Sequence, residues 1–202
     1  MKKSNLHILI TCAVMIAAAT VLSMIKLWEA PYGGSITLLS MVPILLVSCM
    51  FGVKWGLATG FVYSVVQLIL GFSNVAYVPT AWGMFACIML DYIIAFSVLG
   101  LAGLSVPNGL NSKHAILRAT IGSAAALVAR FVCHLISGAV IWYSLDLVWY
   151  ADDPTHIVHK YGPWAFSAIY NGTFMLPEIV ITLIALPFIF KFASSIKSKL
   201  SL

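Results

Sequence analysis

The chain has 202 residues, of which 62% are hydrophobic and only 8% are charged, and its mean hydropathy is +1.04. A soluble domain carries about 25% charged residues, so this composition excludes an ordinary soluble protein and predicts an integral membrane protein. The formal net charge of +5 comes without a basic stripe or an aromatic pattern suited to bases, so we expect no nucleic-acid partner.

Six apolar stretches follow one another along the chain. A membrane-spanning helix needs about 20 mainly apolar residues, so we predict an all-α bundle of six transmembrane helices in a single membrane domain, residues 1–202. The first stretch is longer than the apolar core of a signal peptide, roughly 7–15 residues, and we expect it to be retained. The predicted spans are about 7–27, 37–53, 55–72, 82–104, 115–143 and 164–190.

The charged residues indicate the orientation of the bundle. With the N-terminus in the cytoplasm, eight of the eleven basic residues lie on the inner side, and the loops 28–36, 73–81 and 144–163 face outward. We therefore expect both termini in the cytoplasm and the protein in the plasma membrane of a prokaryote. The inner basic residues are Lys2, Lys3, Lys54, Lys113, Arg118, Lys191, Lys197 and Lys199, and the outer acidic residues are Glu29, Asp146, Asp152 and Asp153.

Small residues and cysteines lie inside the apolar stretches. Ala13 and Ala17, four residues apart, allow another helix to approach closely, either from within the bundle or from a partner protein. Gly56 and Gly60 form a GxxxG pattern, to which we assign helix packing alone. The cysteines show no metal-binding spacing, so we expect packed free thiols; they are Cys12, Cys49, Cys87 and Cys133.

The first outer loop combines aromatic residues with a glycine pair. Trp28 and Tyr32 are of the type found at membrane interfaces. Gly33 and Gly34 permit a tight turn with positive φ. The loop, which continues to Ser35, therefore fits either an interfacial anchor or a lid that folds back over a pocket.

The segment 130–142 places polar groups at regular intervals in an apolar stretch. Arg130, His134, Gly138 and Trp142 follow one another in steps of four, which keeps them near one stripe of a helix. Because contact with lipid is unfavourable for charged groups, we expect this stripe to face protein or water.

Three tryptophans provide a depth scale for the bundle. Trp82, Trp142 and Trp164 are expected at the outer interface. Counting inward at about 1.5 Å per residue places one polar residue of each helix roughly 10–13 Å below its tryptophan. These residues are Asp91, His134 and Asn171, and we expect them to share one level of the bundle.

Two further charges lie deeper. Arg130 and Glu178 are expected at similar depths, roughly 18–21 Å below their tryptophans, where each needs a partner, so we interpret them as a structural ion pair. Asp91 is then left without an opposite charge except His134. An acid among aromatic rings suits a flat or quaternised cation. The aromatic residues near this level are Tyr92, Trp142, Phe166 and Tyr170.

At these residues the chain resembles a known family, the thiamine-specific substrate-binding subunits (ThiT or YuaJ) of energy-coupling factor vitamin transporters. The similar segments follow one another in the same order over most of the chain. They are Gly33-Gly34-Ser35 with Pro43-Ile44, Leu90-Asp91-Tyr92 leading into Leu99-Gly100-Leu101-Ala102-Gly103, His134-Leu-Ile-Ser137-Gly138 with Trp142, and Trp164 through Tyr170-Asn171-Gly172 to Met175-Leu-Pro177.

The resemblance implies a six-helix bundle that binds thiamine from outside. It would deliver thiamine by toppling in the membrane on a module of one transmembrane coupling subunit and two ATPase subunits. No cofactor is implied. Ala13 and Ala17 would contact the coupling subunit, and the lid would contain Tyr32, Gly33, Gly34 and Ser35. The implied ligand-binding residues are Asp91, Tyr92, His134, Gly138, Trp142, Phe166, Tyr170 and Asn171.

Two positions depart from the family pattern, and the outer loop 144–163 is longer than the resemblance implies. Asp91 stands where a glutamate is common, and Phe166 stands where the family has a tyrosine. The first change shortens the acid by one methylene, and the second removes a hydroxyl. A thiamine precursor, either the pyrimidine or the thiazole, therefore remains an alternative cargo.

Other functions lack supporting motifs. Ser137 and His134 share a helix, but neither a GxSxG elbow nor an HExxH motif is present, so we expect no enzyme. His156 and His159 match no standard metal-binding spacing, so we expect no metal site. A stand-alone cation-coupled transporter, with Asp91 as a proton relay, usually has two related halves, and no repeat is visible. The sequence has no P-loop, so any ATP hydrolysis belongs to another chain.

Overall fold

The N-terminal half of the chain begins with a long helix and a hairpin. The computed structural model describes residues 3–31, 33–111 and 114–199. Helix α1 (Lys3–Met24) leads into the antiparallel strands β1 (Lys26–Glu29) and β2 (Ser35–Thr37). The next helices are α2 (Val42–Phe51), α3 (Val53–Leu70) and the single turn α4 (Phe72–Val75).

Each of the next two long helices contains a π-helical segment. The first consists of α5 (Ala81–Cys87), the π-helical segment η1 (Ile88–Ile94), α6 (Ala95–Ser97) and the 3-10 helix η2 (Val98–Ser105). After the turn η3 (Gly109–Asn111), the second consists of α7 (Ala115–Ser137), the π-helical segment η4 (Gly138–Trp142) and α8 (Tyr143–Trp149). The last elements are the short α9 (Ile157–Lys160) and α10 (Pro163–Lys199).

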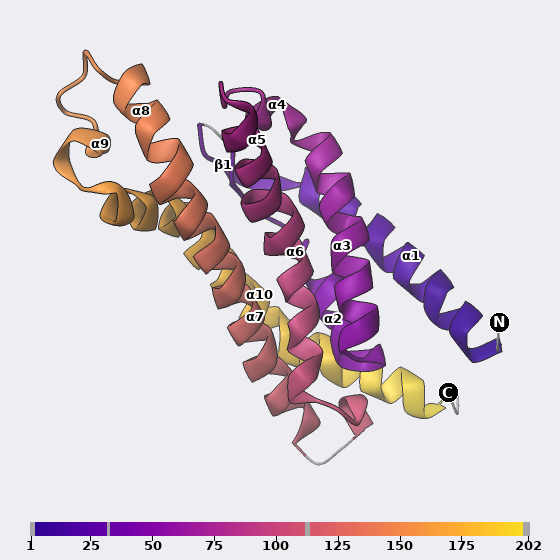
Figure 1. Ribbon diagram of the computed structural model, residues 1–202. Helices are drawn as coiled ribbons and strands as arrows, with labels where there is room; N and C mark the ends of the chain where they lie inside the picture. Colours follow the sequence, from indigo (N-terminus) through magenta and orange to yellow (C-terminus); the bar gives the residue numbers. More distant parts are fainter. Residues whose placement is uncertain (1–2, 32, 112–113, 200–202) are drawn as a thin grey trace.

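The elements form an elongated bundle of helices packed side by side (Figure 1). Helix α1 begins and helix α10 ends at the same end of the bundle. The hairpin, α4 and the α8–α9 connection lie at the opposite end (Figure 1). The two ends of the described chain thus lie on one side, as the charge distribution predicts.

Five helical stretches of the described residues are long and apolar enough to cross a membrane. Helix α2 is apolar too, but its 10 residues extend only about 15 Å, and eight of them are buried. The predicted second span, residues 37–53, is therefore shorter than expected, and a count of six membrane-spanning helices stays a prediction. The five stretches are Asn5–Met24, Val53–Leu70, Ala81–Ser105, Ala115–Trp149 and Pro163–Ser195.

Two predicted helix ends are wrong. Helix α1 ends at Met24, before the predicted residue 27, because the chain turns there into β1, which pairs with β2. The helix predicted to end at residue 143 continues through α8 to Trp149. Asp146 therefore lies in a helix and is only 3% exposed, whereas the sequence placed it in an outer loop.

The core lies where α2, α3 and α7 pack against η2. Helix α3 approaches η2 so closely that a Cβ atom at Gly100 would meet the backbone of Gly56 and Leu57. A Cβ atom at Gly60 would meet the carbonyl oxygen of Phe96. The predicted packing role of the GxxxG pattern is thus confirmed. The predicted thiols are confirmed as well, since all four cysteines are free and buried.

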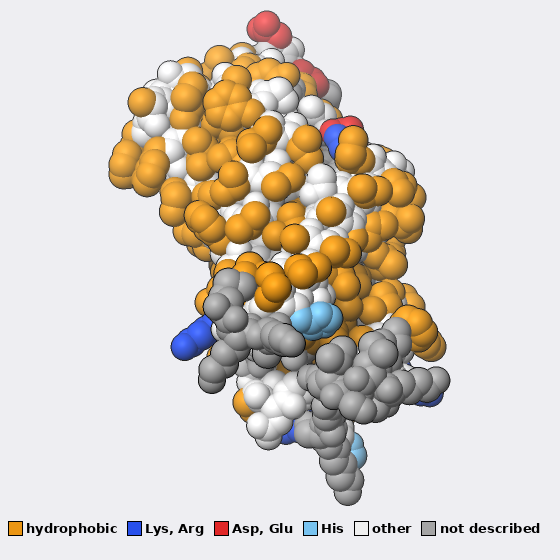
Figure 2. All heavy atoms as spheres, turned by 90° about the vertical axis from the view of Figure 1, so that its right-hand side faces the viewer, with side chains coloured by type: hydrophobic (Ala, Val, Ile, Leu, Met, Phe, Trp, Pro, Cys, Tyr) orange, Lys and Arg blue, Asp and Glu red, His pale blue; other side chains and the backbone are white. Residues whose placement is uncertain are grey.

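The surface carries the pattern of a membrane protein. On the face drawn in Figure 2, hydrophobic side chains cover most of the length of the molecule. Acidic side chains appear toward the upper end of this face, and most of the visible lysine and arginine side chains lie at the lower end (Figure 2). A wide apolar band between charged ends is what a protein that crosses the bilayer requires, and the prediction of an all-α membrane protein is confirmed.

Candidate functional site

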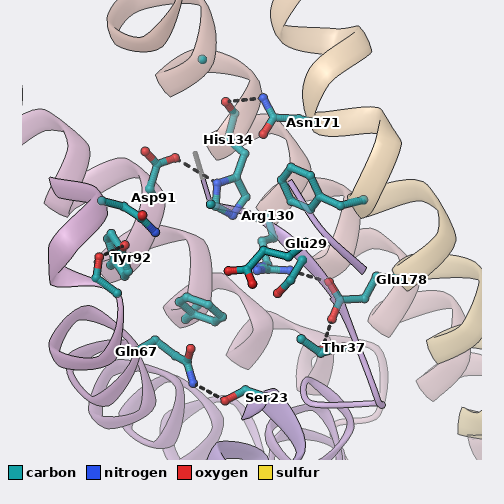
Figure 3. Close-up of a pocket in the computed structure, with 18 of the residues that line it drawn as sticks. Ser23, Glu29, Thr37, Gln67, Asp91, Tyr92, Arg130, His134, Asn171 and Glu178 are labelled. Atoms are coloured by element: carbon teal, nitrogen blue, oxygen red, sulfur yellow. Dashed lines mark hydrogen bonds and ion pairs between the residues drawn. The ribbon is translucent and has the colours of Figure 1, made fainter. Parts of the chain in front are cut away.

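A cavity of about 420 Å³ lies inside the bundle, beneath the hairpin (Figure 3). Its walls come from α1, α3 and α10, from the hairpin, and from both helices that contain a π-helical segment. All eight residues proposed for ligand binding line it: Asp91, Tyr92, His134, Gly138, Trp142, Phe166, Tyr170 and Asn171. The volume falls within the usual range for small-molecule sites, about 300–1,000 Å³.

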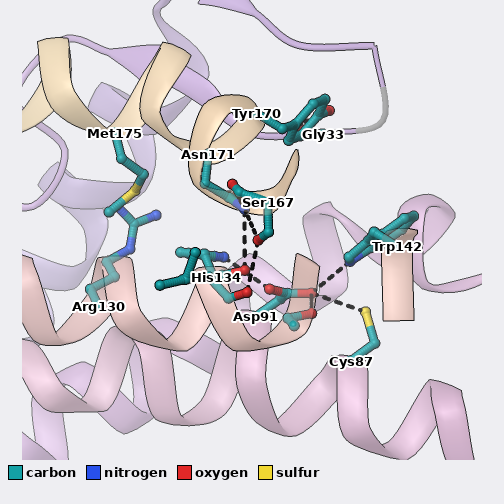
Figure 4. A network of polar contacts seen from close by, with 12 residues as sticks. Gly33, Cys87, Asp91, Arg130, His134, Trp142, Ser167, Tyr170, Asn171 and Met175 are labelled. Atoms are coloured by element: carbon teal, nitrogen blue, oxygen red, sulfur yellow. Dashed lines mark hydrogen bonds and ion pairs between the residues drawn. The ribbon is translucent and has the colours of Figure 1, made fainter. Parts of the chain in front are cut away.

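The carboxylate of Asp91 is the centre of a polar network (Figure 4). His134 Nδ1 lies 2.9 Å from Asp91 Oδ1 and, facing a carboxylate, acts as the donor. Asp91 Oδ2 accepts hydrogen bonds from Ser137 Oγ at 2.6 Å and Trp142 Nε1 at 3.1 Å, and Cys87 Sγ lies 3.4 Å away. This arrangement leaves His134 Nε2 buried without a hydrogen-bond partner among the described residues. The network therefore fixes the orientation of both the imidazole and the indole.

The π-helical segments explain why this stripe of residues keeps facing the cavity. In an α-helix, each step of four residues rotates the side-chain direction by about 40° beyond a full turn. After four such steps the side chain would face almost the opposite side of the helix. A π-helix forms its hydrogen bonds over five residues and turns less per residue, which reverses the drift. Segment η4 lies in the middle of the stripe. As a result, five residues at intervals of four line the cavity: Arg130, His134, Gly138, Trp142 and Asp146.

Asn171 connects α10 to α7 at the level of His134. Its Nδ2 donates to the carbonyl oxygen of His134 at 3.2 Å and to Ser167 at 3.0 and 3.1 Å. Ser167 Oγ in turn donates to the carbonyl oxygen of Leu135 at 2.7 Å. A Cβ atom at Gly138 would collide with Ser167 and Asn171, so the two helices meet at a position where only glycine fits.

The aromatic residues use their polar groups within the protein. Tyr92 donates its hydroxyl to the carbonyl oxygen of Gly71 at 2.9 Å, and Tyr170 donates to that of Gly33 at 3.1 Å. Phe166 is buried and packs against Tyr143 and Tyr170, with ring centroids 5.5 and 6.3 Å away. The tyrosine rings therefore offer the cavity apolar surface rather than free hydroxyls.

The predicted outer loop is the β-hairpin, and it covers the cavity. Gly33 and Gly34 have φ values of 95° and 86°, which confirms the predicted tight turn, and both line the cavity together with Ser35. Tyr32 lies outside the described residues. Phe174 packs so closely on Gly34 that a Cβ atom there would collide with its ring.

Arg130 and Glu178 face each other in the wall of the cavity (Figure 3). Arg130 Nη1 is 3.7 Å from Glu178 Oε2, and Thr37 of the hairpin donates a hydrogen bond to Glu178. The guanidinium lies 4.6 Å from the ring centroid of Phe96 and also contacts the sulfur atoms of Met41 and Met175. These contacts join α7, α10 and the hairpin, as expected of a structural pair.

Ala13 and Ala17 lie on the exposed side of α1. Neither packs inside the bundle, which removes one of the two interpretations of their spacing. In the outer connection, Asp153 accepts hydrogen bonds from Thr155, which hold its pKa below the ordinary value. His156 stacks on Tyr150 with ring centroids 3.7 Å apart. The described residues contain no group of three or more side chains arranged to hold a metal ion.

The depth scale of the sequence analysis was wrong for Trp142. We expected this residue at the outer interface, but its indole lies in the cavity and contacts Asp91 directly. The helix continues beyond it to Trp149, which is partly exposed. The two other tryptophans of the scale, Trp82 and Trp164, are exposed at 77% and 57%.

Several further residues of the site were not predicted as site residues. The sequence points to Ser137 only as part of a segment similar to the family and as a possible hydrolase residue, and to Cys87 only as a packed thiol. Ser167 supports Asn171 from the preceding turn of α10 and was not considered. Asp146 continues the four-residue spacing that leads from Arg130 to Trp142. It was not predicted as a site residue, because the helix was predicted to end at residue 143.

Comparisons with known proteins agree with this architecture. The sequence pattern of a family described as "Thiamine transporter protein (Thia_YuaJ)" matches residues 9–198. The chain is 34% identical over 190 residues to the thiamine transporter ThiT of Bacillus subtilis, covering 90% of this chain and 89% of that protein. It is 27% identical over 151 residues to the thiamine transporter ThiT of Lacticaseibacillus paracasei, covering 71% and 67%. A solved structure of ThiT from Listeria monocytogenes has the same fold, with a TM-score of 0.70 at 22% identity, covering 96% of this chain and 98% of that one.

Proposed function

Because this chain belongs to the thiamine transporter protein family, we propose that it captures thiamine outside the cell as the substrate-binding subunit of an uptake system. The family consists of transporters, so the chain is not an enzyme. It is a multi-pass protein of a bacterial cell membrane. The observation that carries the proposal is the part-buried carboxylate of Asp91 in a cavity walled by aromatic rings.

The chemistry of thiamine supports this assignment. Thiamine joins a flat aminopyrimidine to a thiazolium ring with a fixed positive charge. Aromatic faces attract such a cation through the negative charge of their π-systems, and a nearby carboxylate adds Coulomb attraction in a cavity of low dielectric constant. Asp91 holds the rings of His134 and Trp142 in place, and we assign to these two rings the stacking contacts with the ligand.

The remaining residues have supporting roles in this proposal. Tyr92, Phe166 and Tyr170 provide apolar walls, while Gly138 and Asn171 keep α7 and α10 in close contact around the ligand. The hairpin with Gly33, Gly34 and Ser35 acts as the lid, and Tyr32 belongs to the same loop. Arg130 and Glu178 join α7 to α10 in the wall of the cavity.

We further propose that transport energy comes from other chains. The sequence contains no P-loop, so this subunit would deliver thiamine to an energy-coupling factor module with a transmembrane coupling subunit and two ATPase subunits. The exposed small residues Ala13 and Ala17 offer the coupling subunit a surface on which a helix can pack closely.

Calorimetric titration of the purified protein with thiamine tests the proposed cargo. We expect a Kd in the nanomolar range and quenching of tryptophan fluorescence, because Trp142 lines the cavity. The isolated pyrimidine and thiazole are titrated in parallel, since Asp91 and Phe166 depart from the family pattern. Tight binding of one fragment without binding of thiamine would replace the cargo by a precursor. Thiamine uptake by proteoliposomes that contain this chain alone would instead favour a secondary transporter.

A further inference from the structure

Asp146 is a buried carboxylate that no described group neutralises. It is 3% exposed and lines the cavity from α8. No side chain or backbone group of the described residues donates a hydrogen bond to its carboxylate, and no basic side chain forms an ion pair with it.

The three other carboxylates that line the cavity all have partners. Glu29 forms an ion pair with Lys26 at 2.5 Å, and Glu178 contacts both Arg130 and Thr37. Asp91 is contacted by Cys87 on its own helix and by three donors on the helix that contains α7 and η4. Asp146 is thus the exception in the described part of the cavity wall. The oxygens of this carboxylate are not among the fully buried atoms without a partner, so they face the cavity. An ionised carboxylate in a cavity of low dielectric constant is unfavourable as long as no cation lies beside it.

The position of Asp146 relative to Trp142 suggests that reason. Asp146 follows Trp142 by four residues, so the two side chains are neighbours on the cavity side of the helix. Trp142 donates its Nε1 to Asp91, which lies on the inner side of the indole, while Asp146 lies one turn farther toward the outer end. A flat ligand stacked on this indole therefore has one carboxylate toward each end.

The two carboxylates differ in what a cation gains from them. The charge of Asp91 is already compensated by the donors that surround it, whereas that of Asp146 is not. A ligand cation placed beside Asp146 provides Coulomb attraction and also removes the cost of burying an unpaired charge. We propose that Asp146 forms the ion pair with the fixed positive charge of the ligand and determines the preference for cationic over neutral ring systems. This inference rests on the proposed function, since it assumes that the ligand is thiamine.

The test compares thiamine with an analogue in which a neutral ring of the same shape replaces the thiazolium. Both ligands are titrated by calorimetry into the unmodified protein, Asp146→Asn and Asp146→Glu. We expect Asp146→Asn to weaken thiamine binding more than tenfold and binding of the neutral analogue less than twofold. Asp146→Glu keeps the charge and should retain most of the preference for thiamine. Asp152→Asn removes the same charge from an exposed position and should change neither affinity.

Thermal unfolding of the ligand-free proteins provides a second, independent readout. Removing an uncompensated buried charge should raise the Tm of Asp146→Asn above that of the unmodified protein, whereas loss of a structural contact would lower it. Equal weakening of both ligands, or unchanged binding of thiamine, would overturn the role of Asp146 while leaving the cargo established. Failure of the unmodified protein to bind thiamine would overturn the proposed function and this inference with it.

Discussion

The carboxylate of Asp91 organises the site because four protein groups converge on it. Asp91→Asn keeps the shape of the side chain but removes its charge and turns one acceptor into a donor. We expect thiamine affinity to fall more than tenfold, which corresponds to about 1.4 kcal/mol. Ser137→Ala removes a single neutral donor to the same carboxylate and should cost less, about 1 kcal/mol. Calorimetry measures both.

Substitution of a second serine is the control that distinguishes the loss of a contact to Asp91 from a general loss of helix stability. Ser144 lies on α8, is exposed, and donates its hydroxyl only to the backbone of Ile141. Ser144→Ala should therefore bind thiamine like the unmodified protein. An Asp91→Asn protein with unchanged affinity would remove Asp91 from the binding site.

Gly138 lies where α7 and α10 meet beside the cavity. In Gly138→Ala the new methyl group would collide with Ser167 and Asn171, so we expect a loss of about 1–3 kcal/mol in the free energy of unfolding, together with weaker thiamine binding. Thermal unfolding and calorimetry measure the two effects. Gly172→Ala is the control, because its methyl group would meet only Leu176 at 3.7 Å and the change favours the helix by roughly 0.5–1 kcal/mol. If both variants behaved alike, close packing at Gly138 would not matter.

The hairpin lines the cavity, and we propose that it acts as the lid. Gly34 has a positive φ and lies against the ring of Phe174. Gly34→Ala combines backbone strain with a collision that pushes the hairpin away from α10, so we expect thiamine to dissociate several-fold faster. Stopped-flow tryptophan fluorescence measures this rate. Gly52→Ala introduces a similar strain at φ 91° with open space around the new methyl group. It should leave the dissociation rate unchanged, and an equally fast release from both variants would argue against a lid.

Some sequence patterns were sufficient to predict helices and turns. Long apolar stretches predicted most of the helices, because a bilayer requires about 20 apolar residues whatever surrounds them. The glycine pair predicted a turn, since few other residues adopt positive φ. The strands on either side of this turn were not predicted, because Lys26–Glu29 and Ser35–Thr37 are only four and three residues long and pair only with each other.

Regular helix geometry was enough to predict some of the site residues but not all of them. Polar residues inside apolar stretches correctly indicated Asp91, His134 and Asn171 as neighbours, because buried polar groups seek one another. The depth predicted for Trp142 is wrong because the helix continues beyond this residue to Trp149, so Trp142 is not at its outer end. The same early helix end placed Asp146 in a loop. The π-helical segment η4, which keeps this stripe of residues toward the cavity, was not predicted from the apolar pattern.

At the scale of the whole molecule, the bundle presents two separate surfaces. The cavity opens beneath the hairpin, while Ala13 and Ala17 lie on the exposed side of α1. If α1 docks on a coupling subunit, a large side chain at either alanine should block transport without affecting ligand binding. Ala13→Trp and Ala17→Trp are therefore expected to bind thiamine normally in detergent and to lose at least tenfold in ATP-driven uptake by proteoliposomes that contain the complete energy-coupling factor module.

The control must place the same indole elsewhere on the apolar surface. Ile121 is 60% exposed on α7, which lies on the other side of the bundle from α1 (Figure 1). Ile121→Trp should retain both binding and uptake, because a tryptophan that faces lipid costs little. Normal uptake by both alanine variants would contradict docking through this face of α1. Loss of thiamine binding in the same variants would show instead that α1 supports the cavity, to which it contributes Ser23 and Met24.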